Sequence, residues 1–363
     1  MRASVPTAPQ FAIIDLFSGP GGLDVAAQLL GVRTTGIEWD VDACATRRAN
    51  GLATRQGDVR GFKPDDFPDH NVLAGGPPCQ TFTVAGKGAG RKALDQVLDF
   101  SRRLASGEDP ESIDAELAEL DDERTGLVLE PLKWVLRAIA IDNPYQAIVL
   151  EQVPAVLPVW RAFAEILRSK GYQVREPEVL HTEEYGVPQT RRRAILIARW
   201  SGPTALLKGK PDLPAPTHHR YRKGRPRGAG SADRAPWVAM NDVVRVGQQF
   251  EVVSNYGTGG DPKARGRRRS DEPSATVTGK ISRNRVVSDG VDLQRFSDAE
   301  AGQLQTFPPN YRWRGNGVAQ QVGNAVPPRL ALHIIAAALD LEESRVAKAV
   351  KVLNDGIDHE SEL

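Results

Sequence analysis

The chain has 363 residues and a formal net charge of +1, with 40% hydrophobic and 26% charged residues. This length is sufficient for a large domain with its own core and a second, smaller domain. No run of about 18 apolar residues occurs and the first ten residues lack an apolar signal segment, so we expect no membrane span and a cytoplasmic protein. Two cysteines and six histidines without metal-ligand spacing predict neither a disulfide framework nor a metal site.

The first 200 residues alternate between expected strands and helices. Short apolar runs predict strands at 11–17, 34–40, 71–76, 147–153 and 194–200, and helices are expected after the first strand and near 126–141. Such alternation predicts an α/β fold with a doubly wound, mostly parallel sheet. Sheets of this kind bind ligands outside the carboxyl ends of their strands.

A glycine-rich turn at 18–22 follows the first expected strand. Glycines at a helix N-terminus let a ligand approach the backbone, and Glu38 ends the next strand about twenty residues later, where a carboxylate can accept ribose hydroxyls. Trp39 can cover an adenine face, and Asp58, after a third strand, can accept from the adenine amine. This pattern suits any adenosine cofactor, and a glycine turn without a ligand is the alternative.

Cys79 stands in the stretch GGPPCQTF, residues 75–82. Prolines fix φ and glycines allow another molecule to come close, so the stretch predicts a stiff loop that presents the cysteine. A buried, inert cysteine is the commoner role in general, and we assign that role to Cys44.

Charge is unevenly distributed along the chain. Residues 95–123 contain eleven acidic and two basic side chains, which we interpret as a solvated face. Residues 200–285 contain seventeen basic and seven acidic side chains in a stretch with weak apolar periodicity. Its segments RYRKGRPRG and KARGRRRS indicate a nucleic-acid-binding surface.

Eight motifs in the same order resemble those of DNA (cytosine-5)-methyltransferases and cover nearly the whole chain. They are FSGPGG (17–22), IEWD (37–40), GDVR (57–60), PPCQ (77–80), EQV (151–153), QTRRR (189–193), RFSDAEAGQLQTFP (295–308) and QVGNAVPP (321–328). One departure is Gln152, which stands where the family has Asn; its amide is expected to brace the loop of Cys79.

The resemblance implies the S-adenosylmethionine-dependent methyltransferase fold in three parts. Residues 1–200 would form the catalytic and cofactor-binding domain, and residues 201–290 a target-recognition domain. Residues 291–363 would include a helix at about 327–352 that returns to the catalytic domain.

The resemblance also implies S-adenosyl-L-methionine as cofactor, S-adenosyl-L-homocysteine as product and no metal. The implied cofactor-binding residues are Phe17, Gly19, Gly21, Gly22, Leu23, Glu38, Trp39, Asp58, Val59, Pro78, Asn324 and Val326.

The implied reaction begins when Cys79 adds to C6 of a cytosine flipped out of the duplex. Glu151 would meet N3, and Arg193, with Arg191 as a second candidate, would donate to O2. After methyl transfer to C5, elimination would free Cys79 and leave 5-methylcytosine. The residues expected to contact DNA are Gln80, Lys87, Arg91, Gln189, Arg267, Arg268, Arg269 and Thr276.

Double-stranded DNA is therefore the expected partner of a protein that we expect to be monomeric and, in a prokaryote, associated with the nucleoid. The sequence does not decide whether a separate restriction endonuclease accompanies it. Two alternatives stay open. A cytosine-5 methyltransferase acting on transfer RNA would lack the large basic region, and a catalytically silent DNA-binding protein would have no use for Cys79, Glu151 and Arg193 together.

Overall fold

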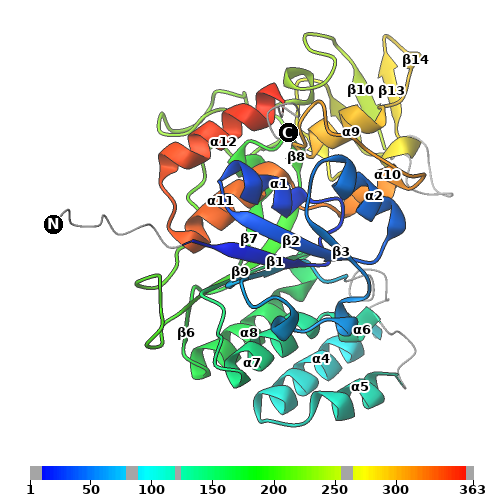
Figure 1. The fold of residues 1–363 in the computed structure, drawn as a ribbon. Helices are drawn as coiled ribbons and strands as arrows, with labels where there is room; N and C mark the ends of the chain where they lie inside the picture. Colours follow the sequence, from blue (N-terminus) through cyan, green and yellow to red (C-terminus); the bar gives the residue numbers. More distant parts are fainter. Residues whose placement is uncertain (1–9, 79–88, 119–123, 255–264, 357–363) are drawn as a thin grey trace.

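An eight-stranded sheet forms the centre of the protein in a computed structural model that describes residues 10–78, 89–118, 124–254 and 265–356 (Figure 1). The first five strands of the sheet are mutually parallel, and the strand β9 runs antiparallel to each of its partners. The sheet is therefore doubly wound and mostly parallel, as the sequence predicts. The strand order is β3 (Thr54–Gln56), β2 (Arg33–Glu38), β1 (Ala12–Leu16), β4 (Val72–Gly75), β5 (Ala147–Gln152), β9 (Arg192–Trp200) and β6 (Tyr172–Val174), and β7 (Glu178–His181) also pairs with β9.

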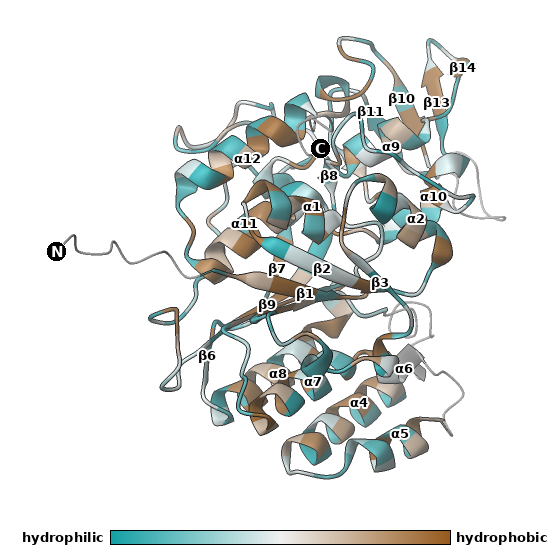
Figure 2. Ribbon diagram, in the orientation of Figure 1, coloured by the Kyte–Doolittle hydropathy of each residue, from teal (hydrophilic) through white to brown (hydrophobic). Residues whose placement is uncertain are grey.

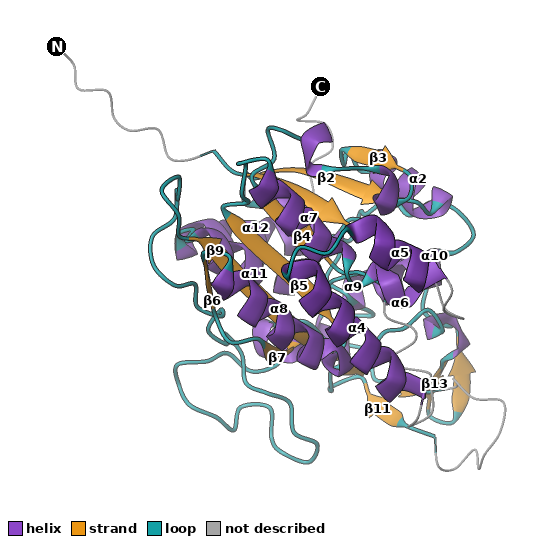
Figure 3. Cartoon of the chain, turned by 90° about the horizontal axis from the view of Figure 1, so that it is seen from below, coloured by secondary structure: helices purple, strands orange, loops and turns teal. Residues whose placement is uncertain are grey.

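Helices cover both faces of this sheet (Figures 1 and 3). One face carries α1 (Gly22–Leu29), α11 (Pro328–Leu339) and α12 (Glu343–Asp355). The other carries α7 (Glu130–Ala140) and α8 (Leu157–Ser169), against which α4 (Ala89–Ala105) packs; α5 (Pro110–Ala118) and α6 (Arg124–Leu127) pack against α4.

Two hydrophobic clusters lie on the two faces of the sheet. Because side chains alternate along a strand, Ile14 of β1 joins the cluster with α8, and Ile13 joins the cluster with α11. Both strand faces are thus apolar, which explains the continuous apolar runs in the sequence (Figure 2). Cys44, on α2 (Val41–Ala49), is fully buried, as expected.

The single helix expected at about 327–352 is in fact two helices. α11 ends at Leu339 and α12 begins at Glu343, because Asp340 adopts a left-handed φ of 55°. α11 packs against α1 and β5, so this part of the chain does return to the large sheet.

Residues Val318–Leu339 are long and apolar enough to cross a membrane by length and composition alone. The structure divides them between α10 (Val318–Asn324) and α11, and 67% of the apolar window is buried inside the protein. Core helices satisfy the same criteria.

A second sheet of four antiparallel strands lies beside α9 (Asp298–Leu304) and α10 (Figure 1, upper right). Its cluster of buried side chains includes Phe250, Val286 and Leu304. Within the described stretch 201–239, which precedes this sheet, no helix or strand forms, in agreement with its weak apolar periodicity. The strand order of this four-stranded sheet is β11 (Arg267–Arg269), β10 (Glu251–Val253), β13 (Arg285–Ser288) and β14 (Val291–Leu293). A separate two-stranded sheet pairs β12 (Ser274–Ala275) with β8 (Gln189–Thr190).

Candidate active site

A cavity of about 480 Å³ opens at the carboxyl ends of β1, β2, β4 and β5. The glycine-rich turn, the end of β2, the end of β5 and the end of α10 form its walls. The volume falls in the range of small-molecule sites. The predicted cofactor residues that line it are Phe17, Gly19, Gly22, Leu23, Glu38, Trp39, Pro78, Asn324 and Val326.

Three backbone amides fix the carboxylate of Glu38 at the cavity wall. Oε1 accepts hydrogen bonds from the amides of Trp39 at 2.9 Å and Asp40 at 2.8 Å, and Oε2 accepts one from Gly19 at 2.8 Å. Because each carboxylate oxygen can accept two hydrogen bonds, Oε2 has room for one more donor, such as a hydroxyl group.

The three glycines of the turn serve different purposes. Gly19 has a φ of 55°, and no other part of the described protein lies within 4 Å of the place where its Cβ would be. A Cβ at Gly22, however, would lie 2.0 Å from the carbonyl oxygen of Val326, and one at Gly21 would lie 2.2 Å from Leu52 Cδ1. The close approach at Gly21 and Gly22 is therefore made by the protein itself, and only Gly19 faces open space.

Asp58 and Val59 do not line the cavity. Asp58 begins the short 3-10 turn Val59–Gly61, and its carboxylate accepts hydrogen bonds from the side chain and backbone of Arg60, which lower the pKa of the carboxyl group. Trp39, by contrast, lines the cavity with 73% of its surface exposed, so its indole ring is available to a ligand.

Glu151 and Arg193 meet at the cavity wall, on the adjacent strands β5 and β9. Arg193 Nε lies 2.5 Å from Glu151 Oε1, and the two side chains are only 11% and 8% exposed. A Cβ at Gly76 would lie 3.4 Å from Glu151 Oε2, so the carboxylate also lies against the segment that leads to Pro78. Both residues line the cavity, where a buried carboxyl and guanidinium can hold a polar ring edge.

Arg191 has other partners, although it also reaches the cavity wall. It is 2% exposed, and its guanidinium donates to the carbonyl oxygens of Val277 at 2.8 Å, Gly323 at 2.9 Å and Ala325 at 3.2 Å. Burial lowers the pKa of this guanidinium. The structure thus separates the two candidate arginines: Arg193 pairs with Glu151, while Arg191 joins residue 277 to the end of α10.

Cys79, Gln80 and Lys87 lie outside the described residues. Pro78, the residue before Cys79, lines the cavity. Arg91 lies in α4, which begins directly after this gap.

Gln189 and Thr276, two of the expected DNA contacts, bond inside the protein. Gln189 is fully buried; its amide nitrogen donates to the carbonyl of Leu304 and to Gln305, and its oxygen accepts from the amide of Val277 at 2.9 Å. The hydroxyl of Thr276 donates to the carbonyl of Thr190 at 2.8 Å. Neither the amide hydrogens of Gln189 nor the Thr276 hydroxyl hydrogen remains for a base.

All three arginines of β11 have partners within the protein, and two of them pair with carboxylates. Arg267 pairs with Glu251 on β10, and Arg269 pairs with Asp271 at 2.7 Å. The guanidinium of Arg268 lies 4.9 Å from the centre of the Tyr221 ring. The basic run that the sequence marks as a phosphate contact is therefore largely engaged within the protein.

Asp15 and Asp42 also line the cavity, although the sequence patterns did not single them out. Asp15 lies in β1, and burial, with the neighbouring Asp24, raises the pKa of its carboxyl well above the usual value. Asp42 accepts hydrogen bonds from the amides of Asn316 at 2.8 Å and Gly317 at 3.1 Å, and so joins α2 to the loop before α10. An acid inside the apolar run AIIDL was the one available signal for Asp15.

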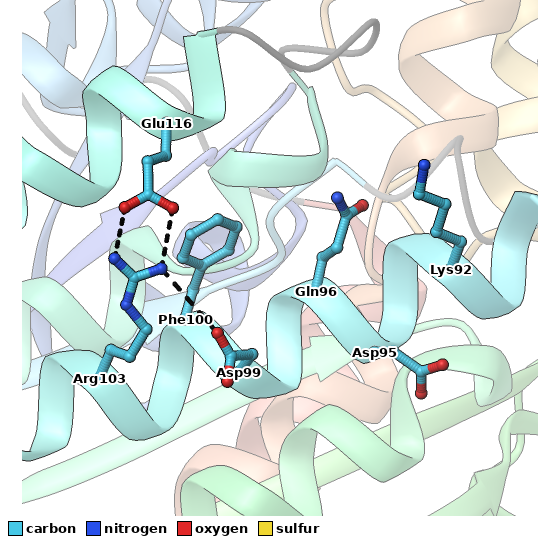
Figure 4. A pocket seen from close by; sticks show the side chains of 7 residues that line it. All are labelled: Lys92, Asp95, Gln96, Asp99, Phe100, Arg103 and Glu116. Carbon is cyan, nitrogen blue, oxygen red and sulfur yellow. Dashed lines mark hydrogen bonds and ion pairs between the residues drawn. The ribbon is translucent and has the colours of Figure 1, made fainter.

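A second hollow, of about 600 Å³, lies on α4 and α5 and contains none of the motif residues (Figure 4). Arg103 forms ion pairs there with Glu116 and Asp99 (Figure 4). The acidic stretch is therefore a partly ion-paired surface, and the cavity at the strand ends remains the candidate active site.

Comparisons with known proteins identify the family that this sequence matches. The model of the C-5 cytosine-specific DNA methylase family matches residues 11–106 and 112–339. The Type II methyltransferase M1.HphI of Haemophilus parahaemolyticus is 29% identical over 90% of this chain and 86% of its own length. M.Eco47II, a Type II methyltransferase of Escherichia coli, is 27% identical over 89% and 78%.

Solved structures share the fold at low sequence identity. The S. pombe Dnmt2 methyltransferase has a TM-score of 0.59 at 16% identity and covers 91% of this chain and 98% of its own. The Entamoeba histolytica methyltransferase EhMeth has a TM-score of 0.57 at 14% identity, covering 92% and 98%.

Proposed function

Because the chain belongs to the C-5 cytosine-specific DNA methylase family, and is thus an enzyme that methylates cytosine in DNA, we propose that it acts through a covalent Cys79–C6 adduct with S-adenosyl-L-methionine as methyl donor. The observation that carries this proposal is the buried pair of Glu151 and Arg193, which shares one cavity with Glu38. A carboxyl and a guanidinium that can meet a ring edge, and a carboxylate that can meet a ribose, thus line the same cavity.

The cavity has the features that an adenosine cofactor requires. Oε2 of Glu38 can accept a ribose hydroxyl, the exposed indole of Trp39 can stack on adenine, and the open space at Gly19 admits the ligand to the backbone. Asn324 and Val326 line the wall formed by the end of α10 and would contact the methionine part. When bound, the cofactor supplies a methyl group made electrophilic by a sulfonium sulfur.

The protein's side chains would make C5 of cytosine nucleophilic. The thiolate of Cys79 adds to C6, Glu151 gives a proton to N3, and Arg193 donates to O2, so that the ring's electron pair becomes available at C5. After C5 is methylated, N3 returns its proton to Glu151. A base then takes the C5 proton, the bond between Cys79 and C6 breaks, and neutral 5-methylcytosine leaves. Since these groups cannot reach a stacked base, the cytosine must be flipped out of the duplex.

Double-stranded DNA containing a specific site is the proposed substrate. Residues 201–290 would recognise that site, residues 1–200 would hold the cofactor, and residues 291–363 would complete the cavity wall through α10 and the residues directly after it. Relatives named as Type II methyltransferases favour DNA over transfer RNA and favour a separate companion endonuclease. We further propose a cytoplasmic monomer, nucleoid-associated in a prokaryote.

The test is 5-methylcytosine in a host without cytosine methylation. Expression of the protein should produce 5-methylcytosine at one sequence context, read by bisulfite sequencing, and Cys79→Ala should produce none. On a duplex of that context carrying 5-fluorocytosine, the wild type should form a stable adduct, because fluorine cannot leave as a proton does. Methylation by Cys79→Ala, or no adduct on this duplex, would contradict the covalent route.

A further inference from the structure

We propose that the turn at 278–283, between β12 and β13, contacts the DNA phosphates beside the target cytosine through Lys280 and Arg283. The inference rests on the proposed function, since it assigns a part of the DNA contact to residues that no motif marks. Four observations lead to it: how the turn is held, where it lies, which charges it carries, and what the neighbouring arginines do.

Inward-facing side chains hold the strand that enters this turn. Gln189 accepts from the amide of Val277, and Arg191 donates to the carbonyl of the same residue. The hydroxyl of Thr276, the residue before Val277, donates to the carbonyl oxygen of Thr190. Gln189 and Thr276, which the sequence analysis expected to contact DNA, therefore fix the start of the turn to β8, and Arg191 adds a further hydrogen bond.

The turn lies against the wall of the cavity. A Cβ at Gly279 would lie 2.1 Å from Oε1 of Gln320, which itself lines the cavity. A Cβ at Gly323 would lie 2.1 Å from the backbone nitrogen of Gly279, so the two backbones touch. A cytosine flipped into the cavity would bring its flanking phosphates next to this turn.

The turn presents positive charge to solvent. Ile281 and Asn284 are 5% and 3% exposed and hold the turn in the protein, while Lys280 and Arg283 are exposed. Within the described part of the chain, no carboxylate lies within 4 Å of either charged group. Arg295 donates to the carbonyl of Ser282 at 3.1 Å, which supports the turn and adds a third positive charge.

The ion pairs of β11 distinguish its arginines from the cations of the turn as partners for phosphate. Arg267 and Arg269 are both ion-paired, so a phosphate would have to replace a carboxylate that is already in place. Lys280 and Arg283 would instead exchange only counterions and water for phosphate, and release of counterions from DNA drives such binding.

The experiment measures the salt dependence of binding to a duplex. The paired variant Lys280→Gln/Arg283→Gln is compared with the matched variant Arg267→Gln/Arg269→Gln by fluorescence anisotropy, from about 50 to about 200 mM salt. Each lost phosphate contact lowers the slope of log K against log salt by about 0.9, so the turn variant should lose about 1.8. The β11 variant should lose less than half of that. Binding of S-adenosylhomocysteine, measured by calorimetry, should stay at wild-type affinity in both variants.

Three results would overturn the inference: an unchanged slope in the turn variant, an equal or larger loss of slope in the β11 variant, or a loss of slope confined to a third variant, Arg222→Gln/Arg225→Gln, in the basic stretch RYRKGRPRG (220–228). Failure of the proposed function is distinguishable from these results. In that case the wild type itself would neither bind the duplex nor methylate it, whereas failure of the inference alone leaves wild-type methylation intact.

Discussion

The side-chain amide of Gln152 donates a hydrogen bond to the carbonyl oxygen of Pro77. Its own oxygen accepts from the amide of Val153 at 2.6 Å. Gln152 ends β5 directly after Glu151, and Pro77 stands two residues before Cys79. The brace expected of this position is therefore confirmed, and the longer Gln side chain spans the gap between the two strand ends.

This contact predicts a ranking of methylation rates. Gln152→Asn should stay within about tenfold of the wild type, because the amide is kept and one shifted hydrogen bond is worth roughly 0.5–1.5 kcal/mol. Gln152→Leu should be slower, because the Pro77 carbonyl loses its donor. Glu151→Gln should be slowest, because the proton donor for N3 is removed. Single-turnover rates on one cognate duplex give the ranking, and a wild-type rate for Gln152→Leu would show that the brace is unimportant.

The central sheet was predictable because its strands are apolar on both faces, and parallel strands bring their carboxyl ends to one edge. That rule is enough to bring Glu38 and Glu151 into one cavity. The hydrogen-bond partners of Arg191, by contrast, could not be predicted from the sequence. Arg191 follows the short strand β8 and bonds to residues 86 or more positions away, and spacing along the chain carries no sign of such partners.

The arginines of β11 show a second limit of sequence reasoning. Whether they carry free charge depends on the pairing of β11 with β10, which brings Glu251 to Arg267. A pattern of basic residues shows how much positive charge a segment has, but the acids that neutralise it come from other elements. The break at Asp340 between α11 and α12 was similarly hidden, because a non-glycine residue there adopts a positive φ.

The glycine-rich turn predicts two different effects of adding one methyl group. Gly22→Ala should lower the melting temperature and weaken binding of S-adenosylhomocysteine, because its Cβ meets the Val326 carbonyl at 2.0 Å. Gly19→Ala should lower the free energy of unfolding by only about 1–2 kcal/mol, which is the strain of an Ala in the left-handed conformation, because the space around its Cβ is open. Gly61→Ala is the control, since its Cβ meets nothing within 4 Å and its φ is ordinary. Thermal unfolding and calorimetry test the three; equal losses at Gly22 and Gly61 would be inconsistent with the packing described.

The buried ion pair between Asp24 and Arg47 predicts a large loss of stability when one partner is removed. Both side chains are fully buried, with Arg47 Nη1 2.6 Å from Asp24 Oδ2. Arg47→Met should lower the free energy of unfolding by about 3–5 kcal/mol, because Asp24 is left as an unpaired buried charge. Arg60→Met, which removes the exposed pair with Asp58, should change it by about 0–1 kcal/mol. Urea unfolding of the two variants provides the comparison, and similar losses would argue against a special role for burial.

Glu183, in the 3-10 turn Thr182–Tyr185, predicts a pH dependence of stability. It is 3% exposed, and burial raises the pKa of its carboxyl to about 7, whereas burial lowers the pKa of the nearby His181 to about 4. Within the described residues, Glu183 Oε2 has no hydrogen-bond partner. The folded protein therefore favours a protonated, neutral Glu183 next to a neutral imidazole.

The sign of the effect follows from this raised pKa. Since the folded state holds the proton more tightly than the unfolded chain, the stabilising contribution of Glu183 is complete below the unfolded pKa of about 4.3 and is lost as pH rises toward 7. His181 acts in the opposite direction below about pH 6.5, so the difference between variant and wild type is the quantity to measure. Glu183→Gln stays neutral at every pH; it should gain stability over the wild type with rising pH, level off above about pH 7, and be more stable by roughly 1–3 kcal/mol at about pH 8. Urea unfolding from about pH 5 to about pH 8 measures this, with the exposed Glu178→Gln as control. Parallel profiles for wild type and Glu183→Gln would mean that Glu183 is already ionised in the folded protein.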